Sequence, residues 1–474
     1  MNDLIQSLQQ QLEEWLLHVP HVNRLVVAFS GGLDSTVLLH ACAALREQRG
    51  SPLDGASERT LEALHVDHGL SPRAPEWASH CRRQCIDLNV PLLCQAARVA
   101  AMPDDMLQGS AKVPEARARD ARYAAFTRYL DKHSALLMAH HQDDQAETVL
   151  LRLLRGAGPA GLAGMPARRS LGAGQLWRPL LEHPRSVLED HARQYGLSWV
   201  EDVSNADTRM DRNYLRHQIL PLIGERWPDW RQSWQLSAQH CAEAADLVSG
   251  LARKDRAAIQ AGPVPFTSAR QCVDGRALIA LPPERQRNVL RHWLQRETGA
   301  PVGARLLSRV LREVLPARAD AAPEVPLAGH RLRRHRHALV VCRELPPFSR
   351  DWQEIWRPEK NGEVLVLPGN GRLVARSTAP GGVPSGTTVT LRYRRRGERC
   401  QLPGRPERAL SRVLQEQGVP VWWRDRLPLV TVSNEVIWIP GVGPSGPASA
   451  MQHSGWAFDW YPPDREREPG HCGG

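Results

Sequence analysis

Lysine is scarce in this chain of 474 residues. The four lysines are Lys112, Lys132, Lys254 and Lys360, although the formal net charge is +10. Arginine therefore supplies nearly all the positive charge. An arginine-rich surface favours phosphate backbones, whereas the compositional habit of a genome would explain the Arg/Lys ratio but not the net charge. Because no lysine precedes Lys112, the glycine-rich turn near residue 31 is not a Walker A loop, which needs one.

Cysteine pairs and long apolar runs are missing as well. None of the nine cysteines forms a C-x-x-C pair, and Cys81 and Cys85 have no second pair that would complete a zinc site. An odd count without a pattern is typical of reduced thiols in the cytosol. No apolar run approaches transmembrane length, and the first residues lack the apolar core of a signal peptide. We therefore expect a cytoplasmic protein with no membrane partner.

The most informative stretch is a turn between an apolar run and a helical pattern. The apolar run at 25–29 stops at Ser-Gly-Gly, and apolar residues at helical spacing begin at Val37. Adjacent glycines let backbone N–H groups face one concavity, and the start of a helix adds a partial positive charge. The turn therefore predicts a phosphate cradle, although an ordinary capped strand-to-helix turn fits equally well. The predicted nucleotide-binding residues are Ser30, Gly31, Gly32, Leu33, Asp34 and Ser35.

Asp34 stands where a cation would be expected beside phosphate. A carboxylate there makes sense if Mg²⁺ lies between the two, so Asp34 is the predicted metal ligand. The run S-G-G-L-D-S at 30–35 resembles the S-G-G-x-D-S signature of the PP-loop ATP pyrophosphatases. That resemblance implies cleavage of ATP between the α- and β-phosphates and adenylation of a substrate oxygen.

The order of elements predicts the fold of the first part. Strands are expected at 25–29, 61–67 and 90–94, with helices between them, which is the β-α-β-α-β order of a doubly wound parallel sheet. Such sheets bind ligands at the carboxyl ends of their strands. Ser30 and the Asp67–His68 pair are therefore expected to share one crevice.

Two further segments carry candidate functional residues. A helix opening near residue 115 presents Arg119 and Arg122, which are also compatible with a solvated charged face. After the next predicted strand, His140, Asp143, Asp144 and Glu147 fall within eight residues, more polar groups than a helix N-cap needs.

Three arginines between 209 and 216 follow an acidic turn at 201–207. They suggest either phosphate contacts or a surface salt-bridge network, and the sequence favours neither.

Taken together, five segments resemble the tRNA(Ile)-lysidine synthase family. They are S-G-G-L-D-S, H-V-D-H-G-L, E-A-R-A-R-D-A-R-Y, A-H-H-Q-D-D-Q-A-E-T with the following L-L-R-L-L-R-G-A-G, and E-D-V-S-N-A-D with R-N-Y-L-R. The first identifies only the superfamily, whereas the fourth and fifth are specific to the family. The match covers residues 20–222.

The resemblance implies a reaction between ATP·Mg²⁺, free L-lysine and the tRNA(Ile) with the anticodon CAU. The wobble cytidine O2 attacks the α-phosphate and releases pyrophosphate; the lysine ε-amine then attacks C2 and releases AMP, leaving lysidine. Residues 30–35 would hold the pyrophosphate, and Arg119 or Arg122 would stabilise the α-phosphate. His140, Asp143 and Asp144 would hold the lysine ammonium and take its proton.

The length allows two to four domains. We expect an α/β domain with a doubly wound, mainly parallel sheet at 1–222, a helical tRNA-binding domain at 223–345, a small α+β tRNA-binding domain at 346–461 and a disordered tail at 462–474. The basic run 331–337 suits phosphate neutralisation, or a strand with a solvated basic face. Arginines interleaved with Trp422 and Trp423 suit phosphate contact and base stacking. The sequence leaves a homodimer possible.

Three other functions stay open. A tRNA thiolase of the same superfamily commonly needs a C-x-x-C pair, which is missing here. An amide-forming ligase of small metabolites would not need the arginine-rich second half, and a non-enzymatic RNA-binding protein would not need the nucleotide loop.

Overall fold

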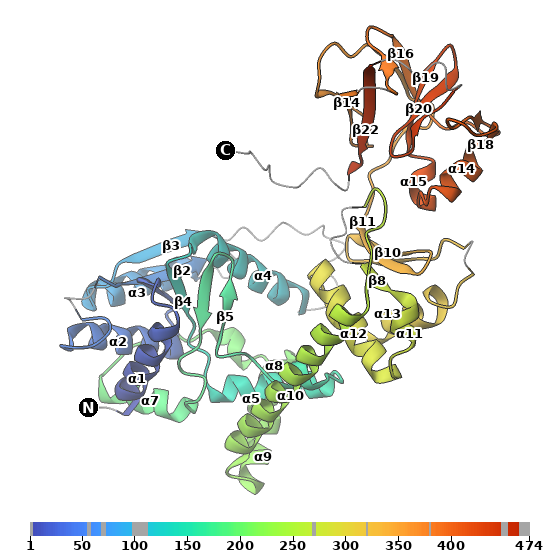
Figure 1. Ribbon diagram of the computed structural model, residues 1–474. Coiled ribbons are helices and arrows are strands. Elements are labelled where there is room, and N and C mark those ends of the chain that lie inside the picture. The colour runs from blue at the N-terminus through green and yellow to red at the C-terminus, as the bar shows by residue number, and fades with distance from the viewer. Residues whose placement is uncertain are drawn as a thin grey trace. The chain divides into compact units, whose positions relative to one another are not determined.

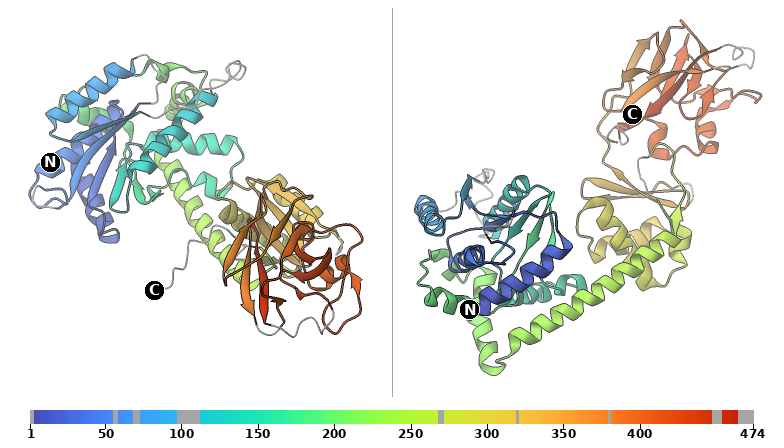
Figure 2. Two further views of the ribbon diagram at one scale, coloured as in Figure 1. Left: turned by 90° about the horizontal axis from the view of Figure 1, so that it is seen from above. Right: turned by 60° about the vertical axis from the view of Figure 1, so that its left-hand side comes forward.

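The computed structural model describes residues 3–54, 58–67, 73–96, 112–267, 272–318, 321–378, 381–446 and 454–463. The chain forms two compact units, Met1–Asp246 and Leu247–Gly474, each described here by itself (Figures 1 and 2). The predicted division at 222, 345 and 461 stays a prediction. The predicted tail falls outside the described residues from 464 onward.

The first unit is built on a six-stranded sheet in the order β3-β2-β1-β4-β6-β5. Neighbouring strands run parallel except β5, which is antiparallel to β6. The strands are β1 (Arg24–Ala28), β2 (Thr60–Asp67), β3 (Leu92–Ala96), β4 (Ser134–Leu137), β5 (Arg168–Leu171) and β6 (Gly174–Trp177).

Both faces of this sheet are covered, as a parallel sheet requires. Successive side chains of a strand point to opposite faces, so Leu25 and Val27 join one buried cluster and Val26 joins another. Burying each such side chain contributes about 1.5–3 kcal/mol. The first cluster is formed with α1 (Asp3–His18), α2 (Leu33–Glu47), α3 (Ala74–Asp87) and α7 (Arg185–Gln194), the second with α4 (Lys112–Tyr129). The predicted doubly wound, mainly parallel α/β fold is confirmed.

A group of helices follows the sheet in the same unit. Helix α5 (Gln142–Leu154) begins directly after β4 and contacts α6 (Pro159–Leu162) and α8 (Asp211–Tyr214). A π-helical segment (Leu215–Ile219), α9 (Leu220–Arg226) and the first part of the long α10 (Trp230–Ala258) complete the group; the rest of α10 belongs to the second unit. These helices carry the charged residues that surround α5.

The prediction of a helical domain at 223–345 is wrong. Alongside its helices, this part contains a five-stranded antiparallel sheet in the order β7-β8-β11-β10-β9. The helical spacing in the sequence is real, but two short strands lie between the helices and three more follow them, one of which is rich in arginine. The elements are β7 (Gln260–Ala261), β8 (Cys272–Asp274), α11 (Gly275–Ile279), α12 (Pro283–Thr298), α13 (Ala304–Arg309), β9 (Glu324–Leu327), β10 (His330–His335) and β11 (Ala338–Arg343).

The basic run predicted to contact phosphate forms strand β10. Arg331 pairs with Glu324 at 2.7 Å and with Glu344 at 2.8 Å, and Arg333 pairs with Glu324 at 3.2 Å. Arg334 donates to backbone carbonyls at 315–318. These three arginines therefore have partners inside the protein, which fits the alternative of a strand with a basic face.

The C-terminal part of the second unit is largely antiparallel β. One sheet has the order β12-β16-β19-β20-β21 and another β13-β14-β22-β15. The strands are β12 (Gln353–Trp356), β13 (Glu363–Val366), β14 (Arg372–Thr378), β15 (Val383–Pro384), β16 (Val389–Tyr393), β19 (Pro428–Val432), β20 (Glu435–Ile439), β21 (Gly443–Pro444) and β22 (Gly455–Tyr461). A hairpin of β17 (Arg399–Cys400) and β18 (Arg408–Ala409) and two helices, α14 (Leu410–Glu416) and α15 (Val421–Arg424), accompany them.

Trp423 is not available for the base stacking that the sequence suggests. Its side chain is fully buried, and its ring lies 5.4 Å from that of Trp460 in the core. The ring of Trp422 is covered by the guanidinium of Arg333 at 5.3 Å.

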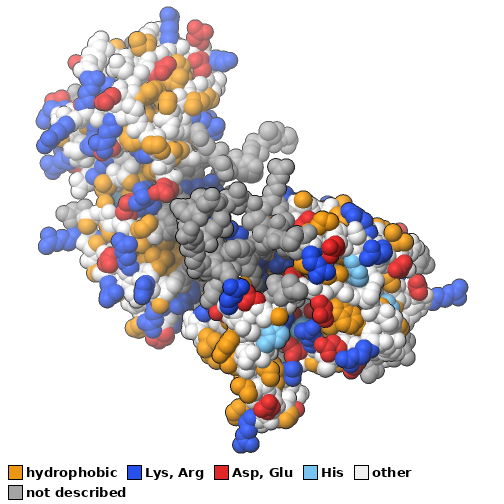
Figure 3. Space-filling view, turned by 180° about the vertical axis from the view of Figure 1, so that it is seen from behind, with side chains coloured by type: hydrophobic (Ala, Val, Ile, Leu, Met, Phe, Trp, Pro, Cys, Tyr) orange, Lys and Arg blue, Asp and Glu red, His pale blue; other side chains and the backbone are white. Residues whose placement is uncertain are grey.

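The surface is mixed in charge. On the face drawn in Figure 3, Lys and Arg side chains are spread over the molecule and interspersed with Asp and Glu. Among the helices that the structure describes, none combines the length and the apolar character needed to cross a membrane.

Candidate functional site

The carboxyl ends of β1, β2 and β4 meet around one cavity of about 370 Å³. Strand β1 pairs with β2 on one side and with β4 on the other, so the order of the sheet reverses at β1, where doubly wound sheets bind ligands. We call the cavity at this edge of the sheet the reaction cavity. The loop after β1 contributes Ser30, Gly32, Asp34 and Ser35; its other polar lining residues are His65, Asp67, Trp77, Arg122, His140, Asp144, Asp202 and Asn205. His68 lies outside the described residues.

The Ser-Gly-Gly turn is folded tightly on itself. The hydroxyls of Ser30 and Ser35 lie 3.0 Å apart, and the Gly32 amide donates to Ser30 Oγ at 3.3 Å. Gly31 has φ +82°, and a Cβ there would lie 2.9 Å from Cys81 Sγ, so this position requires glycine. Helix α2 starts at once, and no side chain caps its N-terminus among the described residues. The backbone N–H groups of the first turn of α2, uncapped by any described side chain, form an arrangement that can receive an anion.

Asp34 lies in that first turn beside a buried histidine. Its Oδ2 is 3.7 Å from His141 Nε2, and its Oδ1 is buried without a hydrogen-bond partner among the described residues. Burial raises the pKa of Asp34, and the nearby Asp144 carboxylate raises it further, against the opposing effect of His141. Arg185 and Arg216 also oppose the rise, but burial outweighs all the nearby positive charge.

These features fit a Mg²⁺ ion at Asp34. The carboxylate has a free buried oxygen and a second carboxylate close by, and carboxylate oxygen is the ligand type that Mg²⁺ prefers. Within the described ranges, no three His, Cys, Asp or Glu side chains gather as a complete ligand set. Phosphate oxygens and water would complete the coordination, as is usual for Mg²⁺ at phosphate sites.

His141 and Asp144 form the start of helix α5. The Asp144 amide donates to His141 Nδ1 at 3.4 Å, and the His141 amide donates to Asp144 Oδ2 at 3.1 Å, a reciprocal capping box. Burial alone would raise the pKa of Asp144, but His141 and Arg212 outweigh it and bring the pKa to about 2. Asp144 is therefore a fixed negative charge in the reaction cavity, connected to Asp34 through one imidazole.

His140 lines the reaction cavity as a neutral group. Its Nδ1 accepts from Arg178 Nε at 3.2 Å. Burial lowers its pKa to about 3, and the arginines Arg178 and Arg212 act in the same direction. Such a histidine is a weak proton acceptor near neutral pH, which favours hydrogen bonding to substrate over the predicted role as a base.

Acid should destabilise the first unit through His140. The folded pKa of about 3 lies below the ordinary value of 6.5, so between these values only the unfolded chain binds the proton. The contribution to stability is constant above about pH 6.5 and falls toward pH 3, by up to about 1.4 kcal/mol per pH unit. We expect His140→Asn to flatten the pH dependence of the free energy of unfolding in urea below pH 6.5. The exposed His240→Asn is the control; equal slopes in the two variants would contradict this reading.

Two of the predicted catalytic residues, and Gly31 and Leu33 of the predicted nucleotide-binding residues, do not line the reaction cavity. Asp143 accepts from the backbone amide of Arg185 at 2.9 Å and from Arg231 Nε at 2.6 Å, so it joins α5 to α7 and α10. Arg119 lines a second cavity with Tyr123. Of the two arginines proposed for the α-phosphate, Arg122 is the one in the reaction cavity.

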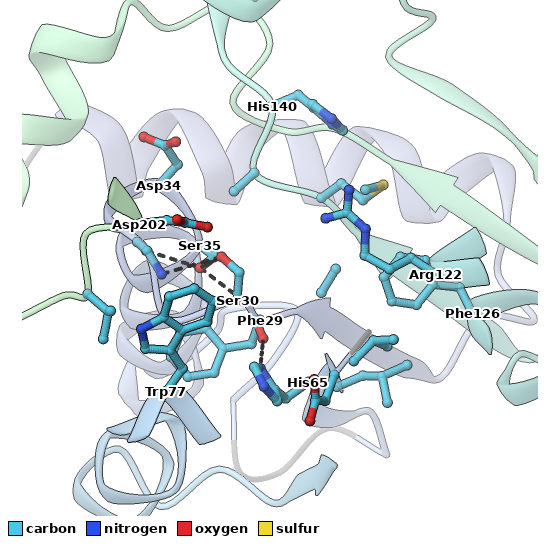
Figure 4. Close-up of a pocket in the computed structure, with 18 of the residues that line it drawn as sticks. Phe29, Ser30, Asp34, Ser35, His65, Trp77, Arg122, Phe126, His140 and Asp202 are labelled. Carbon is cyan, nitrogen blue, oxygen red and sulfur yellow. Dashed lines mark hydrogen bonds between the residues drawn. The ribbon is translucent and has the colours of Figure 1, made fainter. Parts of the chain in front are cut away.

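The two sides of the reaction cavity differ in chemistry. Figure 4 shows Ser30, Asp34 and Ser35 on one side, and Arg122, Phe126 and His140 facing them from the other. If the loop at residues 30–35 holds the phosphates of a nucleotide, the reaction cavity leaves space between those phosphates and Arg122.

Behind Asp144 lies an ion network that joins Glu147 to two of the arginines noted between 209 and 216. Glu147 is fully buried; its oxygens accept from Arg212 Nε and Arg216 Nε, both at 2.6 Å. Both arginines also reach Asp144 Oδ1 at 3.1 Å. The arginines at 212 and 216 therefore bind carboxylates, and the salt-bridge alternative for this segment is correct, although the network is buried rather than on the surface.

Other residues of the site were missed. A signal existed for Asp202 and Asn205, which belong to a motif already noted. None existed for Trp77, whose position in the cavity depends on the packing of α3.

Comparison with known proteins gives three family matches. The PP-loop domain matches residues 3–223, the TilS substrate binding domain residues 276–340 and the TilS substrate C-terminal domain residues 389–460. A tRNA(Ile)-lysidine synthase from Pseudomonas fluorescens is 39% identical over 98% of this chain and 98% of its own length. Those from Coxiella burnetii and Alkalilimnicola ehrlichii are 38% and 42% identical, over 92% and 88% of this chain and 93% and 89% of their own.

Proposed function

The chain belongs to the tRNA(Ile)-lysidine synthase family, and from this premise we propose that it attaches free L-lysine to C2 of the wobble cytidine in tRNA(Ile) with the anticodon CAU. It is a ligase that uses ATP and binds tRNA. The observation that carries the proposal is the reaction cavity, where an uncapped helix start and a serine-glycine turn lie beside Asp34 and opposite Arg122.

The first step is adenylation of the cytidine. The cytidine O2 attacks the α-phosphate of ATP, and pyrophosphate leaves. Residues 30–35 and the start of α2 donate hydrogen bonds to the departing phosphates, and Arg122 neutralises charge at the α-phosphate. Bound at Asp34, Mg²⁺ would supply further charge neutralisation there.

The second step is attack by lysine. Its ε-amine forms the bond to C2 of the adenylated ring, AMP leaves, and one proton of the ammonium is lost. Of the groups predicted to receive lysine, His140 and Asp144 line the cavity. Arg212 and Arg216 both bind Asp144 Oδ1, so Oδ2 is the oxygen that Asp144 offers to an ammonium group. His140 offers a neutral hydrogen-bonding group. Asp143 is occupied by Arg231 and Arg185 and would act by positioning helix α5.

Exchange of labelled pyrophosphate into ATP tests this function. We expect exchange that depends on tRNA(Ile) and disappears when the wobble cytidine is replaced by uridine. Exchange without tRNA would indicate an amide-forming ligase, and exchange retained with uridine a thiolase-like acceptor. Binding of tRNA without any exchange would indicate an RNA-binding protein. Each of these three results would contradict the proposal.

We further propose that the enzyme uses Mg²⁺ and is cytoplasmic. The oxygen of Asp34 that has no partner among the described residues supports the first, and the cysteines without a pairing pattern support the second. The sequence is compatible with a homodimer.

A further inference from the structure

We propose that a second cavity, of about 310 Å³, binds a phosphodiester group of the RNA next to the reacting cytidine; this rests on the proposed function. We call it the arginine cavity. Four arginines line it around one tyrosine: Arg119, Arg152, Arg169 and Arg178 with Tyr123.

The arginine cavity has positive charge without a matching negative charge. None of its lining residues is an aspartate or glutamate, and among the described residues none of its four arginines forms an ion pair with a carboxylate. Burial alone would raise the pKa of Tyr123, but Arg178, Arg119 and Arg169 outweigh burial and lower it. A phenol whose ionisation is favoured in this way lies in an uncompensated positive potential.

The guanidinium groups are held in place before any ligand arrives. Arg152 donates to the carbonyls of Gly161 and Gly164 at 2.8 and 2.6 Å, and Arg178 donates to the carbonyl of Pro166 at 2.7 Å. A guanidinium has five N–H donors, so donors remain for an anion. Ordering before binding lowers the entropic cost of association.

The other two arginines are exposed and lie against the tyrosine. The guanidinium carbons of Arg119 and Arg169 are 5.5 and 5.4 Å from the centroid of the Tyr123 ring. The planar guanidinium of arginine presents its N–H donors in a rigid fork that matches the oxygens of a phosphate. Arginine next to an aromatic ring is common where proteins bind RNA. The cavity thus combines an anchored inner pair of arginines with an accessible outer pair.

The arginine cavity shares a wall with the reaction cavity. Arg178 bonds His140, and Tyr123 Oη lies 3.7 Å from Met138 Sδ; both partners line the reaction cavity. One helical turn of α4 separates Arg122, in the reaction cavity, from Arg119 in the arginine cavity. ATP phosphates are proposed at residues 30–35, across the reaction cavity from Arg122 (Figure 4), whereas the arginine cavity adjoins the side that carries Arg122. The backbone of the bound cytidine is therefore the anion left for the arginine cavity.

The test measures RNA and nucleotide binding in Arg169→Gln. The substrate is an anticodon stem-loop of tRNA(Ile), titrated between about 50 and 200 mM salt. We expect roughly tenfold weaker RNA binding, a salt slope smaller by about 1, and unchanged affinity for a non-hydrolysable ATP analogue. Arg155→Gln, an exposed arginine outside the cavity, is the matched control.

A neutral methylphosphonate placed in turn at each linkage flanking the cytidine completes the test. At the contacted linkage, the difference between Arg169→Gln and the unaltered enzyme should disappear. Loss of ATP-analogue or pyrophosphate binding with RNA binding intact would overturn the proposal in favour of a nucleotide phosphate, and so would RNA binding equal to that of Arg155→Gln. Failure of the proposed function can be told apart from these two outcomes, because in that case the unaltered enzyme would transfer no lysine.

Discussion

Replacing Asp34 with asparagine should reduce release of AMP and pyrophosphate by at least about a hundredfold while leaving the fold intact. Asparagine keeps the shape of the side chain but removes its charge next to the phosphate-binding turn. In the native enzyme, Asp34 Oδ1 has no protein partner among the described residues. The loss should appear in the first step, because Asp34 is proposed to hold the Mg²⁺ that neutralises the charge developing on the phosphates. The measurement is the rate of release of labelled AMP in the presence of tRNA(Ile), ATP and lysine.

Asp87→Asn is the control for this experiment, because Asp87 is an exposed aspartate on helix α3 of the same unit. We expect it to act like the unaltered enzyme. If Asp34→Asn still formed the adenylated tRNA at the normal rate and failed only to transfer lysine, Asp34 would belong to the second step and the assignment here would be wrong.

Glu147→Gln should lower the free energy of unfolding of the first unit by about 3 kcal/mol. The side chain of Glu147 is fully buried and bonds two arginines, so removing its charge leaves two half-buried cations with Asp144 as their shared carboxylate. This loss of stability lies at the lower end of the range for breaking a buried ion pair, because Asp144 compensates part of the positive charge. The midpoint and slope of urea unfolding measure it.

A surface carboxylate provides the comparison. Glu189 pairs with Arg185 at 3.3 Å and with Arg193 at 3.7 Å, with 37% of its side chain exposed. Exposed pairs contribute less than about 1 kcal/mol, so Glu189→Gln should have a small effect. Equal destabilisation by the two variants would show that the network around Glu147 does not hold this part of the fold together.

The first unit could be predicted from the sequence because its signals are local. The apolar runs before Ser30 and His140 become β1 and β4, and each ends in polar residues at the same edge of the sheet. The rule that parallel strands bind ligands at their carboxyl ends then brings residues 30–35 and Asp144 together.

Adjacent residues on a helix were harder to assign. Asp143 and Asp144 are indistinguishable in sequence, yet about 100° of helix separates their directions. Asp144 lines the reaction cavity, and Asp143 binds Arg231, eighty-eight positions along the chain. Arg119 and Arg122 divide in the same way between two cavities. Only the packing of neighbouring helices decides such cases.

The middle of the chain shows a different limit. Arg331 and Arg333 suggested a surface for phosphate because composition shows charge but not partners. Their partner Glu324 lies on the neighbouring antiparallel strand β9. The helical spacing of the segments before it gave no indication that these two strands would pair. The same holds for Trp423, whose neighbour in the core, Trp460, lies on β22.

Lysine transfer to the wobble cytidine is tested by nucleoside analysis of tRNA(Ile) after incubation with this protein, ATP and labelled lysine. We expect label in the nucleoside at the wobble position, in amounts equal to the AMP released. AMP release with no label in that nucleoside, or label elsewhere in the tRNA, would contradict this proposal.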